Sequence, residues 1–542
     1  MPVVSVCIFL LLWLCVPLAA QIPLIAYRGV VNAASRMPTG LPAGAIARGS
    51  VFAIAGQNLG PAKEVSAAAY PLDKTLGGVG VRVVQGSTTL DAIPLYVSPG
   101  LIHAVMPSNA PLGLVSLQIT YNNFRSSLAP VRVVETSVGM FSMNGAGFGP
   151  AVAQTVAVTT DDDGNTSTAL SANSPAAPAK PGQQVILWAT GLGASAAGDT
   201  LAPTPNDPAT PVEVWVGGKS VQVVSSGRSA CCSSTGGFGF GVPAEVTGAA
   251  ARTVLGPGTD QVVVQLPDDV PAGCYLPVQL RAAKLVSNTV TIAVSADGSP
   301  CTDPLNPLSQ QLTKGKIGVV TALRTALRFD VNVPSPRDAV VDTFAVSLRQ
   351  ETGSPFAFNP LIGLPPAGSC TTYTAVGDLF DGTDLPGTAP TGKYLDGGAT
   401  MDLTTDKASR RITLSKTASL HMTPVGLSRP GTPLKANLFL EPGDVQTNSN
   451  GGPDVGRVRA KLTMSAPLTW TNRDKIATID RTQPLALTWT GAAAGKPVGV
   501  LGMAVDRPTN ASVAFVCVAA PDAAGLTVPS WVLANLPPTR KR

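Results

Sequence analysis

Charged residues and histidine are scarce in this chain. Charged residues make up 13% of the 542 positions, the formal net charge is +5, and the one dense basic cluster is Arg540-Lys541-Arg542. A nucleic-acid-binding protein needs a concentrated basic face, so no nucleic-acid partner is predicted. The two histidines, His103 and His421, fall in different predicted domains. A Ser-His-Asp triad is therefore not expected, and no Gly-x-Ser-x-Gly turn is present to hold a serine nucleophile.

Metal-binding spacings and long apolar runs are also missing. The sequence has no Cys-x-x-Cys pair and no cluster of histidines, so neither a zinc site nor any other cofactor is predicted. The longest apolar run, Val3 to Leu18, is broken only by Ser5 and leads into Ala19-Ala20. This pattern predicts a secretory signal peptide over residues 1–20. An uncleaved anchor is the alternative, although the run is short for a bilayer span of about 20 residues.

After the signal, no segment has the length and apolar character of a membrane span. The mature chain is therefore predicted to be secreted or extracytoplasmic, at the cell surface or in the periplasm. Six cysteines remain, an even number that predicts three disulfides in an oxidising compartment. They are Cys231, Cys232, Cys274, Cys301, Cys370 and Cys517.

The spacing of these cysteines limits how they can pair. Adjacent Cα atoms lie about 3.8 Å apart, below the usual disulfide range of about 4.4–6.8 Å, so Cys231 should not pair with Cys232. Pairing within domains joins Cys370 to Cys517. Cys231 and Cys232 are then each expected to reach Cys274 or Cys301.

A repeated pattern indicates that a domain has been duplicated. Residues 49–60 align without a gap on residues 182–193, and residues 101–113 align on residues 261–273. Each block resembles a strand that runs into a turn set by Gly or Pro, which is the form of a tandem repeat. The offset grows from 133 to 160, so the second copy carries 27 extra residues, which fall around residues 226–259.

Composition and periodicity predict an all-β fold. Gly (55) and Pro (49) are abundant while hydrophobic residues still make up 44%, as expected for many short strands and turns. Val212, Val214 and Val216 alternate with Glu213 and Trp215, the period of a strand with one buried face. We therefore predict tandem immunoglobulin-like β-sandwiches followed by a C-terminal β-sandwich-like domain.

The predicted boundaries follow from these patterns. The first immunoglobulin-like domain spans residues 21–136. The second spans 137–297, with a leading linker that includes Asp161 to Pro181 and with the Cys-containing insertion. Residues 298–313 form a linker, and 314–542 form one C-terminal β-domain. There we expect strands at 317–331, 340–349, 411–415, 457–464 and 485–490, buried Trp470 and Trp489, and a helical turn within 529–536.

Several motifs that imitate functional sites have simpler explanations. Gly191-Leu192-Gly193 follows a strand as a dinucleotide fingerprint does, but prolines rather than a helix come next, so we interpret it as a turn. Asp161, Asp163 and Asn165 have a spacing that suits Ca²⁺, but the distal glutamate is missing and a solvated turn is favoured. A carboxylate pair, Asp268-Asp269, aligns with Ser108-Asn109 and is also interpreted as a turn.

Two residues form the one candidate binding surface. Trp215 lies on the opposite face of its strand from the three valines, beside Glu213. An outward tryptophan can stack on a sugar or pack against another domain, and domain packing is the favoured use. His103, on an apolar strand, is interpreted as structural.

The same residues resemble a known family. Val31-Asn32-Ala33-Ala34-Ser35, residues 56–60 and residues 96–100 leading into Pro107 resemble a repeat of secreted, mostly uncharacterised acidobacterial proteins of the Solibacter type. Residues 189–193, 273–278 and 287–288 are similar to its second form. The resemblance covers most of residues 28–297 and departs at His103 and Ala104, where the family has an Asn-bearing segment.

This resemblance implies immunoglobulin-like domains of the transcription-factor and plexin type (IPT/TIG) in a secreted or surface module without established catalytic activity. The segments around Cys370 and Cys517 look like a companion domain of the same group. We therefore expect a non-catalytic binding, adhesion or structural protein, with an extracellular glycan or an envelope protein as its partner. The alternative is a secreted hydrolase with its active site in the C-terminal β-domain.

Overall fold

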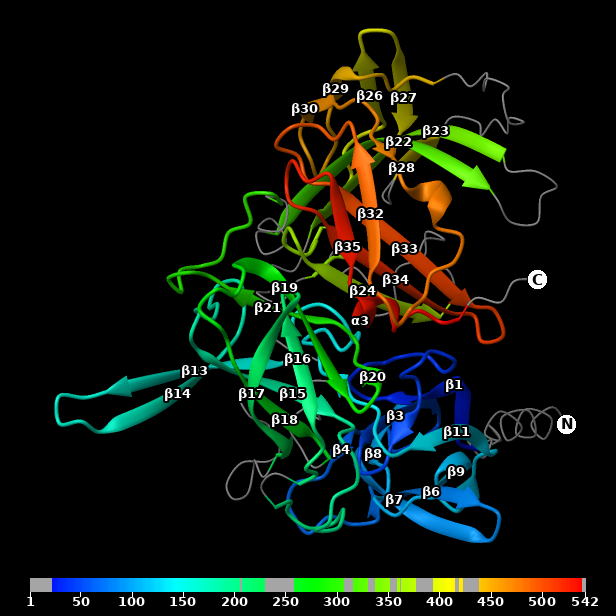
Figure 1. The fold of residues 1–542 in the computed structure, drawn as a ribbon. Coiled ribbons are helices and arrows are strands. Elements are labelled where there is room, and N and C mark those ends of the chain that lie inside the picture. The colour runs from blue at the N-terminus through cyan, green and yellow to red at the C-terminus, as the bar shows by residue number, and fades with distance from the viewer. Residues whose placement is uncertain are drawn as a thin grey trace, which may run out of the picture.

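The structure, a computed structural model, confirms the all-β class. It describes residues 22–204, 207–229, 258–306, 315–329, 337–350, 358–360, 362–376, 393–414, 419–422 and 438–538. Within these ranges the strands form six sheets, and the one α-helix is α3 (Ser530–Leu533) (Figure 1). The predicted signal peptide, Cys231 and Cys232 lie outside the described residues, so their predictions stay untested.

The first sandwich, residues 22–134, is built from a sheet that folds over on itself. Its strands run in the order β1-β3-β8-β7-β6-β9-β11-β2. The bounds are β1 (Leu24–Asn32), β2 (Ile46–Ala47), β3 (Val51–Gln57), β6 (Val79–Gln85), β7 (Thr88–Val97), β8 (Leu101–Val105), β9 (Gly113–Tyr121) and β11 (Ala129–Val134). Short strands β4 (Val65–Ser66), β5 (Thr75–Leu76) and β10 (Phe124–Arg125) pair with β7, β6 and β9.

The second sandwich, residues 137–295, has the order β14-β13-β15-β18-β17-β16-β19-β20. Two further strands, β12 (Gly139–Met140) and β21 (Val290–Val294), pair with β15 and β19. The other bounds are β13 (Ala153–Thr160), β14 (Thr166–Ala172), β15 (Gln184–Thr190), β16 (Val212–Val216), β17 (Lys219–Arg228), β18 (Asp260–Gln265), β19 (Gly273–Ala282) and β20 (Leu285–Val286).

The two sandwiches share their strand order, and the aligned blocks occupy equivalent places. Strands β3 and β8 of the first correspond to β15 and β18 of the second, and each pair is antiparallel. The first half of β7 pairs with β6 and its second half with β8, with a register shift between Pro94 and Tyr96. Strand β17 is divided in the same way between β16 and β18, with a shift between Val223 and Ser225.

A bulge thus bends the same strand from one layer of each sandwich into the other. The 27 extra residues fall between β17, which ends at Arg228, and β18, which begins at Asp260. Each sandwich encloses its own apolar core. As the alternating pattern predicted, Val214 and Val216 are fully buried while Glu213 is exposed.

The leading linker predicted before the second sandwich is wrong over much of its length. Residues 166–172 form β14, which pairs with β13 along seven consecutive positions, and Asp161 to Asn165 make the turn between them. Five of the eight residues of β13 are Thr or Val, and β-branched residues favour strands. The Ser, Ala and Asn content of the next segment resembles a linker, but that segment completes the hairpin.

The C-terminal region, residues 315–538, has two apolar cores rather than the single core implied by one domain. The outer core lies between two sheets. One has the strand order β22-β23-β25, with β28 also paired to β23, and the other has the order β27-β26-β29-β30. The inner core lies between β24-β34-β33 and β31-β32-β35. Figure 1 shows the inner sheets next to the sandwiches and the outer sheets farther away.

All five of the expected C-terminal strands are present, with ends that differ by a few residues. The outer strands are β22 (Lys316–Phe329), β23 (Arg337–Gln350), β25 (Lys393–Tyr394), β26 (Thr400–Thr405), β27 (Ser409–Thr413), β28 (Ser419–Met422), β29 (Gly443–Ser449) and β30 (Arg459–Met464). The inner strands are β24 (Cys370–Val376), β31 (Thr469–Trp470), β32 (Leu485–Thr490), β33 (Gly499–Asp506), β34 (Ala511–Val518) and β35 (Gly525–Val528). Helix α3 is the predicted turn of helix.

Of the two tryptophans predicted to be buried, one is and one is not. Trp489 is buried and donates to the Ala523 carbonyl oxygen. Trp470 is 44% exposed, so its prediction is wrong. It pairs with Trp489 on the neighbouring strand, but β31 is a two-residue strand at the edge of its sheet, where β32 is its one partner among the described strands.

Two disulfides are present among the described cysteines. Cys370 bonds to Cys517, as predicted, and joins neighbouring positions of β24 and β34. Cys274 bonds to Cys301, which corrects the prediction that each of them would pair with Cys231 or Cys232. The chain turns back after β21 and brings Cys301 over a bulge in β19 that contains Cys274, a close approach that linear spacing does not indicate.

Candidate binding site at the junction of the three regions

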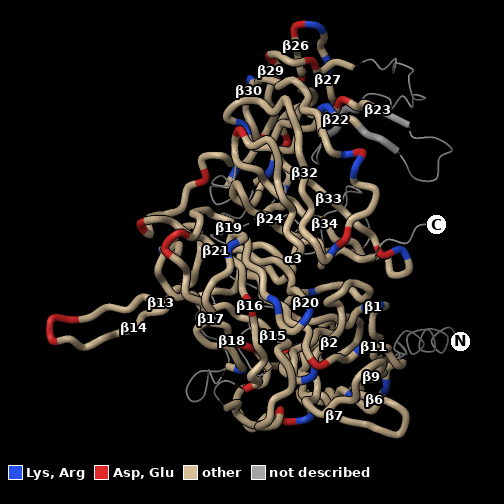
Figure 2. Tube along the Cα trace, in the orientation of Figure 1, with Lys and Arg blue, Asp and Glu red and all other residues tan. Residues whose placement is uncertain are grey.

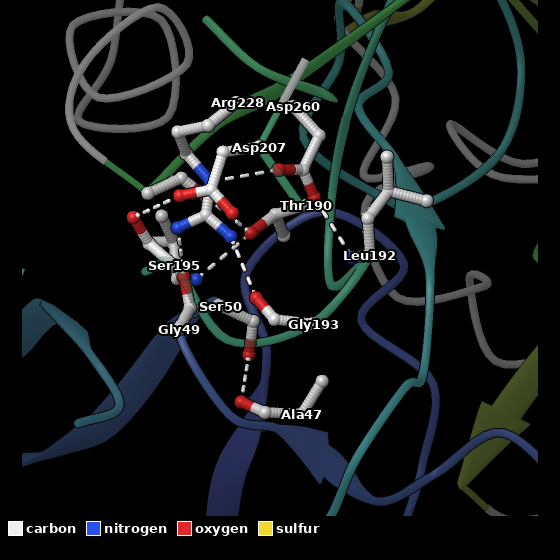
Figure 3. A network of polar contacts seen from close by, with 12 residues as sticks. Ala47, Gly49, Ser50, Thr190, Leu192, Gly193, Ser195, Asp207, Arg228 and Asp260 are labelled. Carbon is white, nitrogen blue, oxygen red and sulfur yellow. Dashed lines mark hydrogen bonds and ion pairs between the residues drawn. The ribbon is translucent and has the colours of Figure 1, made fainter. Parts of the chain in front are cut away.

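A buried ion pair within the second sandwich also bonds to the first sandwich. Arg228, at the end of β17, donates from Nε to the Asp260 carboxylate at the start of β18 over 2.8 Å, and both side chains are almost fully buried. The remaining guanidinium nitrogens donate to carbonyl oxygens of Gly49 in the first sandwich (2.5 Å) and Gly193 in the second (2.8 Å). Figure 3 shows this network. Arg228 therefore satisfies groups from both copies at once.

The turn that imitates a dinucleotide fingerprint belongs to this network. The Leu192 amide donates to Asp260 Oδ2 over 2.8 Å, and Gly191 and Gly193 adopt φ angles of 108° and 137°, which favour glycine. The Thr190 hydroxyl accepts from the Val51 amide and donates to the Gly258 carbonyl oxygen. The motif is thus a turn, as predicted, and its polar atoms bind protein groups.

Apolar contacts extend the connection between the sandwiches. One buried cluster contains Ala53 and Val105 of the first sandwich and Phe141, Ile186 and Trp188 of the second. Buried ion pairs hold their geometry only when every polar atom has a partner, which is the case for the contacts of Arg228 and Asp260. The tandem copies therefore form one continuous body.

The C-terminal region packs on both sandwiches. Met37 and Leu41 of the first sandwich enter the inner core, and Arg28 donates to carbonyl oxygens of Pro508 and Thr509. The buried hydroxyl of Thr289, in the second sandwich, lies 2.6 Å from the buried hydroxyl of Thr372, on β24 of the C-terminal region. The three regions consequently meet around α3 and the β19–β20 hairpin (Figure 1).

The predicted pair Trp215 and Glu213 lies at this junction. The Trp215 ring stacks on Trp531 of α3, with ring centroids 6.1 Å apart and an angle of 21° between the planes. The Arg281 guanidinium lies 5.3 Å from the Trp215 ring centroid and makes two hydrogen bonds of 2.7 and 2.5 Å to the Glu213 carboxylate. Trp215 therefore makes a contact between regions, the use that its pattern favoured. Sugar binding by this pair stays a prediction.

A pocket of about 300 Å³ opens beside these residues. Two segments connect the stacked tryptophans to this pocket. Trp531 lies on α3, and Ala534, just after that helix, lines the pocket. Arg281 lies on β19, and Lys284, in the turn that follows this strand, also lines the pocket. Its ten lining residues come from all three regions: Gly40, Pro42, Lys284, Leu285, Val286, Arg481, Thr482, Ala534, Asn535 and Pro538.

The chemistry of the pocket suits a ligand with both an anionic group and hydroxyls. Lys284 and Arg481 are cationic, and no acidic side chain is among the described lining residues. Arg481 also donates to the Leu536 carbonyl oxygen, which fixes its position beside the pocket. The Thr482 hydroxyl donates to Asp480 Oδ1 over 2.7 Å and can accept a hydrogen bond, whereas Asn535 is 2% exposed and its amide donates to the Trp531 carbonyl oxygen. Pro42, Leu285 and Pro538 supply apolar surface. Sequence patterns missed this site because its residues lie far apart along the chain.

His103 has a structural environment. It is 2% exposed on β8, its Nε2 lies 3.4 Å from Arg36 Nη2, and its ring centroid lies 5.9 Å from that of Tyr96. Burial, followed by the nearby Arg36 cation, lowers the pKa of His103 to about 3. The imidazole is therefore neutral at pH 7 and poorly suited to take up a proton. The side chain of His421 lies outside the described residues.

The acidic motifs form turns. Asp161 Oδ1 accepts from the Asn165 amide (2.7 Å) and the Asp163 amide (3.1 Å), and these hydrogen bonds lower the pKa of Asp161. Asp268 and Asp269 lie between β18 and β19, where Asp269 forms an ion pair with Lys219. Both motifs are turns, as predicted. Within the residues that the structure describes, no group of three metal-ligating side chains is found.

Several carboxylates of the C-terminal region are engaged as anions. Burial alone would raise the pKa of Asp342, but hydrogen bonds from Arg324 and from the Leu440 and Phe439 amides lower it. A hydrogen bond from Arg411 lowers the pKa of Asp402, and one from Lys461 lowers that of Asp444. A glycosidase acid needs a raised pKa, and these three groups are shifted in the opposite direction.

Comparisons with known proteins give weak similarities only. No protein-family model matches the sequence, and no curated protein matches it. Among solved structures, domains 5–6 of the S-layer protein SbsC are 16% identical and match with a TM-score of 0.15, covering 51% of this chain and 99% of theirs. A mutant Salmonella alpha-2-macroglobulin is 11% identical with a TM-score of 0.14, covering 93% of this chain and 28% of its own.

Similarity at this level identifies neither a family nor a function. The fold and the junction themselves define an all-β protein of two fused sandwiches and a two-core C-terminal region, with disulfides at Cys274–Cys301 and Cys370–Cys517. Among the described residues no helix is long and apolar enough to cross a bilayer.

Proposed function

We propose that this protein is an exported, non-catalytic binding protein that holds an acidic glycan of the cell exterior in the pocket at the junction of its three regions. The junction pocket is the observation that carries the proposal. Lys284 and Arg481 supply two positive charges to the pocket lining, against one neighbouring carboxylate, Asp480, which accepts from the Thr482 hydroxyl. The excess of positive charge attracts a carboxylate.

A uronate-bearing sugar fits the rest of the lining. The Thr482 hydroxyl can accept from a ring hydroxyl while it donates to Asp480, and the proline and leucine surfaces can contact the C–H face of a sugar ring. A small inorganic anion would use the cations alone. The combination of cations, hydroxyl and apolar surface therefore favours the acidic sugar.

Export is supported by the disulfides. Cys370–Cys517 and Cys274–Cys301 form in oxidising compartments and are rare in the cytosol. The predicted signal peptide is consistent with them. The fused sandwiches support a positioning role, because the ligand-binding groups lie on parts of the chain that are fixed to one another by the buried Arg228 network and the packed cores.

The experiment is a glycan array probed with the purified mature chain, with neutral and uronate-bearing oligosaccharides of matched length. We expect binding to the acidic members. Lys284→Ala and Arg481→Met should each weaken it by roughly 10- to 100-fold, the effect of losing one charge-assisted hydrogen bond of roughly 1.5–3 kcal/mol.

Lys63→Ala is the matched control, because Lys63 is an exposed lysine of the first sandwich outside the pocket. Binding that falls equally in the control, or that is equal for neutral and acidic sugars, would disprove the pocket assignment. Hydrolysis of any array member by the intact chain would instead favour the hydrolase alternative.

A further inference from the structure

The β13–β14 hairpin projects away from the body of the second sandwich (Figure 1). Strand β14 is the last strand of the ten-stranded sheet, and among the described strands it pairs with β13 alone. Six of its seven residues are exposed, and the register from Gln154–Ala172 to Thr160–Thr166 is uninterrupted. One edge of β14 therefore presents backbone N–H and C=O groups that are unused by the sheet.

Other edge strands of the molecule carry features that discourage pairing. Strand β1 has a register shift between Ile25 and Val30, and Arg28 within it has a positive φ of 56°. Strand β27 carries Arg410 and Arg411, and β30 carries Arg459 and Lys461. Bulges and charges at edges are the usual means by which proteins prevent strand addition.

Strand β14 has none of these features. Its sequence, Thr-Ser-Thr-Ala-Leu-Ser-Ala, contains no charge, proline or glycine, and its register has no bulge. Exposed apolar side chains accompany it, since Leu170 is 51% and the neighbouring Val158 63% exposed. Val156 lies opposite Leu170 and packs on the core shared by the sandwiches, so an apolar stripe continues from that core along the hairpin.

We propose that β14 pairs with β14 of a second copy of this chain, in antiparallel orientation about a twofold axis near Ala169. The strand is complementary to itself in this arrangement. Ala169 meets its counterpart, Leu170 meets Thr168, and Ser171 meets Ser167, so that uncharged residues face one another at every position.

The charge of the hairpin tip favours the same orientation. Asp161, Asp162 and Asp163 gather at the turn, where Figure 2 shows the acidic colour. Parallel pairing would place two such tips side by side. Antiparallel pairing separates them by about the length of seven residues at roughly 3.4 Å each, well beyond the screening length of about 8 Å at physiological salt. A second copy therefore fits this edge, and the inference does not depend on the proposed ligand.

Sedimentation velocity of the mature chain over a range of concentrations tests the proposal. We expect a dimer whose population rises with concentration. Ala169→Lys should raise the Kd of this dimer at least tenfold, because the two added cations meet at the twofold axis. Thr159→Lys is the matched control: Thr159 is exposed on the same face of the hairpin, but on β13 rather than on the edge.

Circular dichroism at the monomer concentration checks that each variant is folded, and Ser167→Lys serves as a second edge variant should Ala169→Lys unfold. Loss of the dimer in the edge variants alone supports the pairing. A chain that stays monomeric at every concentration, or a dimer that resists both edge variants, overturns it. Equal loss in Thr159→Lys also overturns it, because the charge would then act without regard to the edge.

Discussion

Replacing Asp260 by alanine should destabilise the two sandwiches more than a change at any exposed ion pair. The variant would leave the Arg228 guanidinium buried, with its carbonyl partners but without its carboxylate. The Leu192 amide would lose its acceptor as well. Removing one partner of a buried pair typically costs about 3–5 kcal/mol, because the remaining charge is left uncompensated.

A domain of 150–250 residues loses roughly 2–4 °C in Tm per kcal/mol, and the lower value suits a unit as large as the fused sandwiches. We therefore expect Asp260→Ala to lower the Tm of the transition that includes the sandwiches by roughly 6–10 °C. Differential scanning calorimetry of the mature chain measures this shift. The double variant Arg228→Met/Asp260→Leu should recover much of the loss, since it removes both charges and keeps apolar volume.

Asp269→Asn is the control for this experiment. Asp269 forms an ion pair with Lys219 at the surface of the same sandwich, and exposed pairs contribute little. Its Tm should equal that of the wild type within error. A loss of less than about 1 kcal/mol in the free energy of unfolding for Asp260→Ala, or a double variant as unstable as the single one, would refute the conclusion that this ion pair stabilises the contact between the sandwiches.

Three further outcomes are expected. Folding lowers the pKa of His103 from 6.5 to about 3, so the folded state loses stability relative to the unfolded state as the pH falls from 6.5 towards 3, by up to about 1.4 kcal/mol per pH unit. In urea unfolding, the stability of His103→Gln should therefore depend less steeply on pH than that of the wild type. Equal slopes for the two proteins would contradict this. The double variant Cys370→Ser/Cys517→Ser should lower the free energy of unfolding by roughly 2–5 kcal/mol, because it opens a loop of 147 residues. The loss should be smaller for Cys274→Ser/Cys301→Ser, which opens a loop of 27 residues. Equal losses in melting curves would contradict this order. Trp215→Ala and Trp531→Ala should show a coupling of about 0.5–1.5 kcal/mol in a double-mutant cycle, whereas additive effects would mean that the stacked rings contribute nothing to docking.

Sequence patterns predicted the features that depend on local periodicity. The turn residues that end the aligned blocks located the duplicated strands β3, β8, β15 and β18, because a strand followed by a Gly- or Pro-set turn has the same form in both copies. The Cys370–Cys517 bond followed from the distribution of cysteines between domains. Alternation likewise predicted the buried face of β16.

Features that depend on tertiary contacts were not predictable in this way. Strand β14 resembles a linker because its Ser, Thr and Ala residues are exposed on a projecting hairpin and need no apolar pattern. Arg228 and Asp260 adjoin the 27-residue insertion, and nothing in their local sequence shows that the same guanidinium reaches Gly49. The junction pocket collects residues from Gly40 to Pro538, so only the packed fold brings them together.

Binding of an acidic sugar in the junction pocket can be measured by isothermal titration calorimetry of the mature chain with a uronate-bearing oligosaccharide and with its carboxyl-reduced counterpart. We expect one site per chain for the acidic form, and loss of that site in a Lys284→Ala/Arg481→Met variant that melts like the wild type. Equal heats for the two sugars, or unchanged binding in that variant, would show that the pocket does not bind the acidic group.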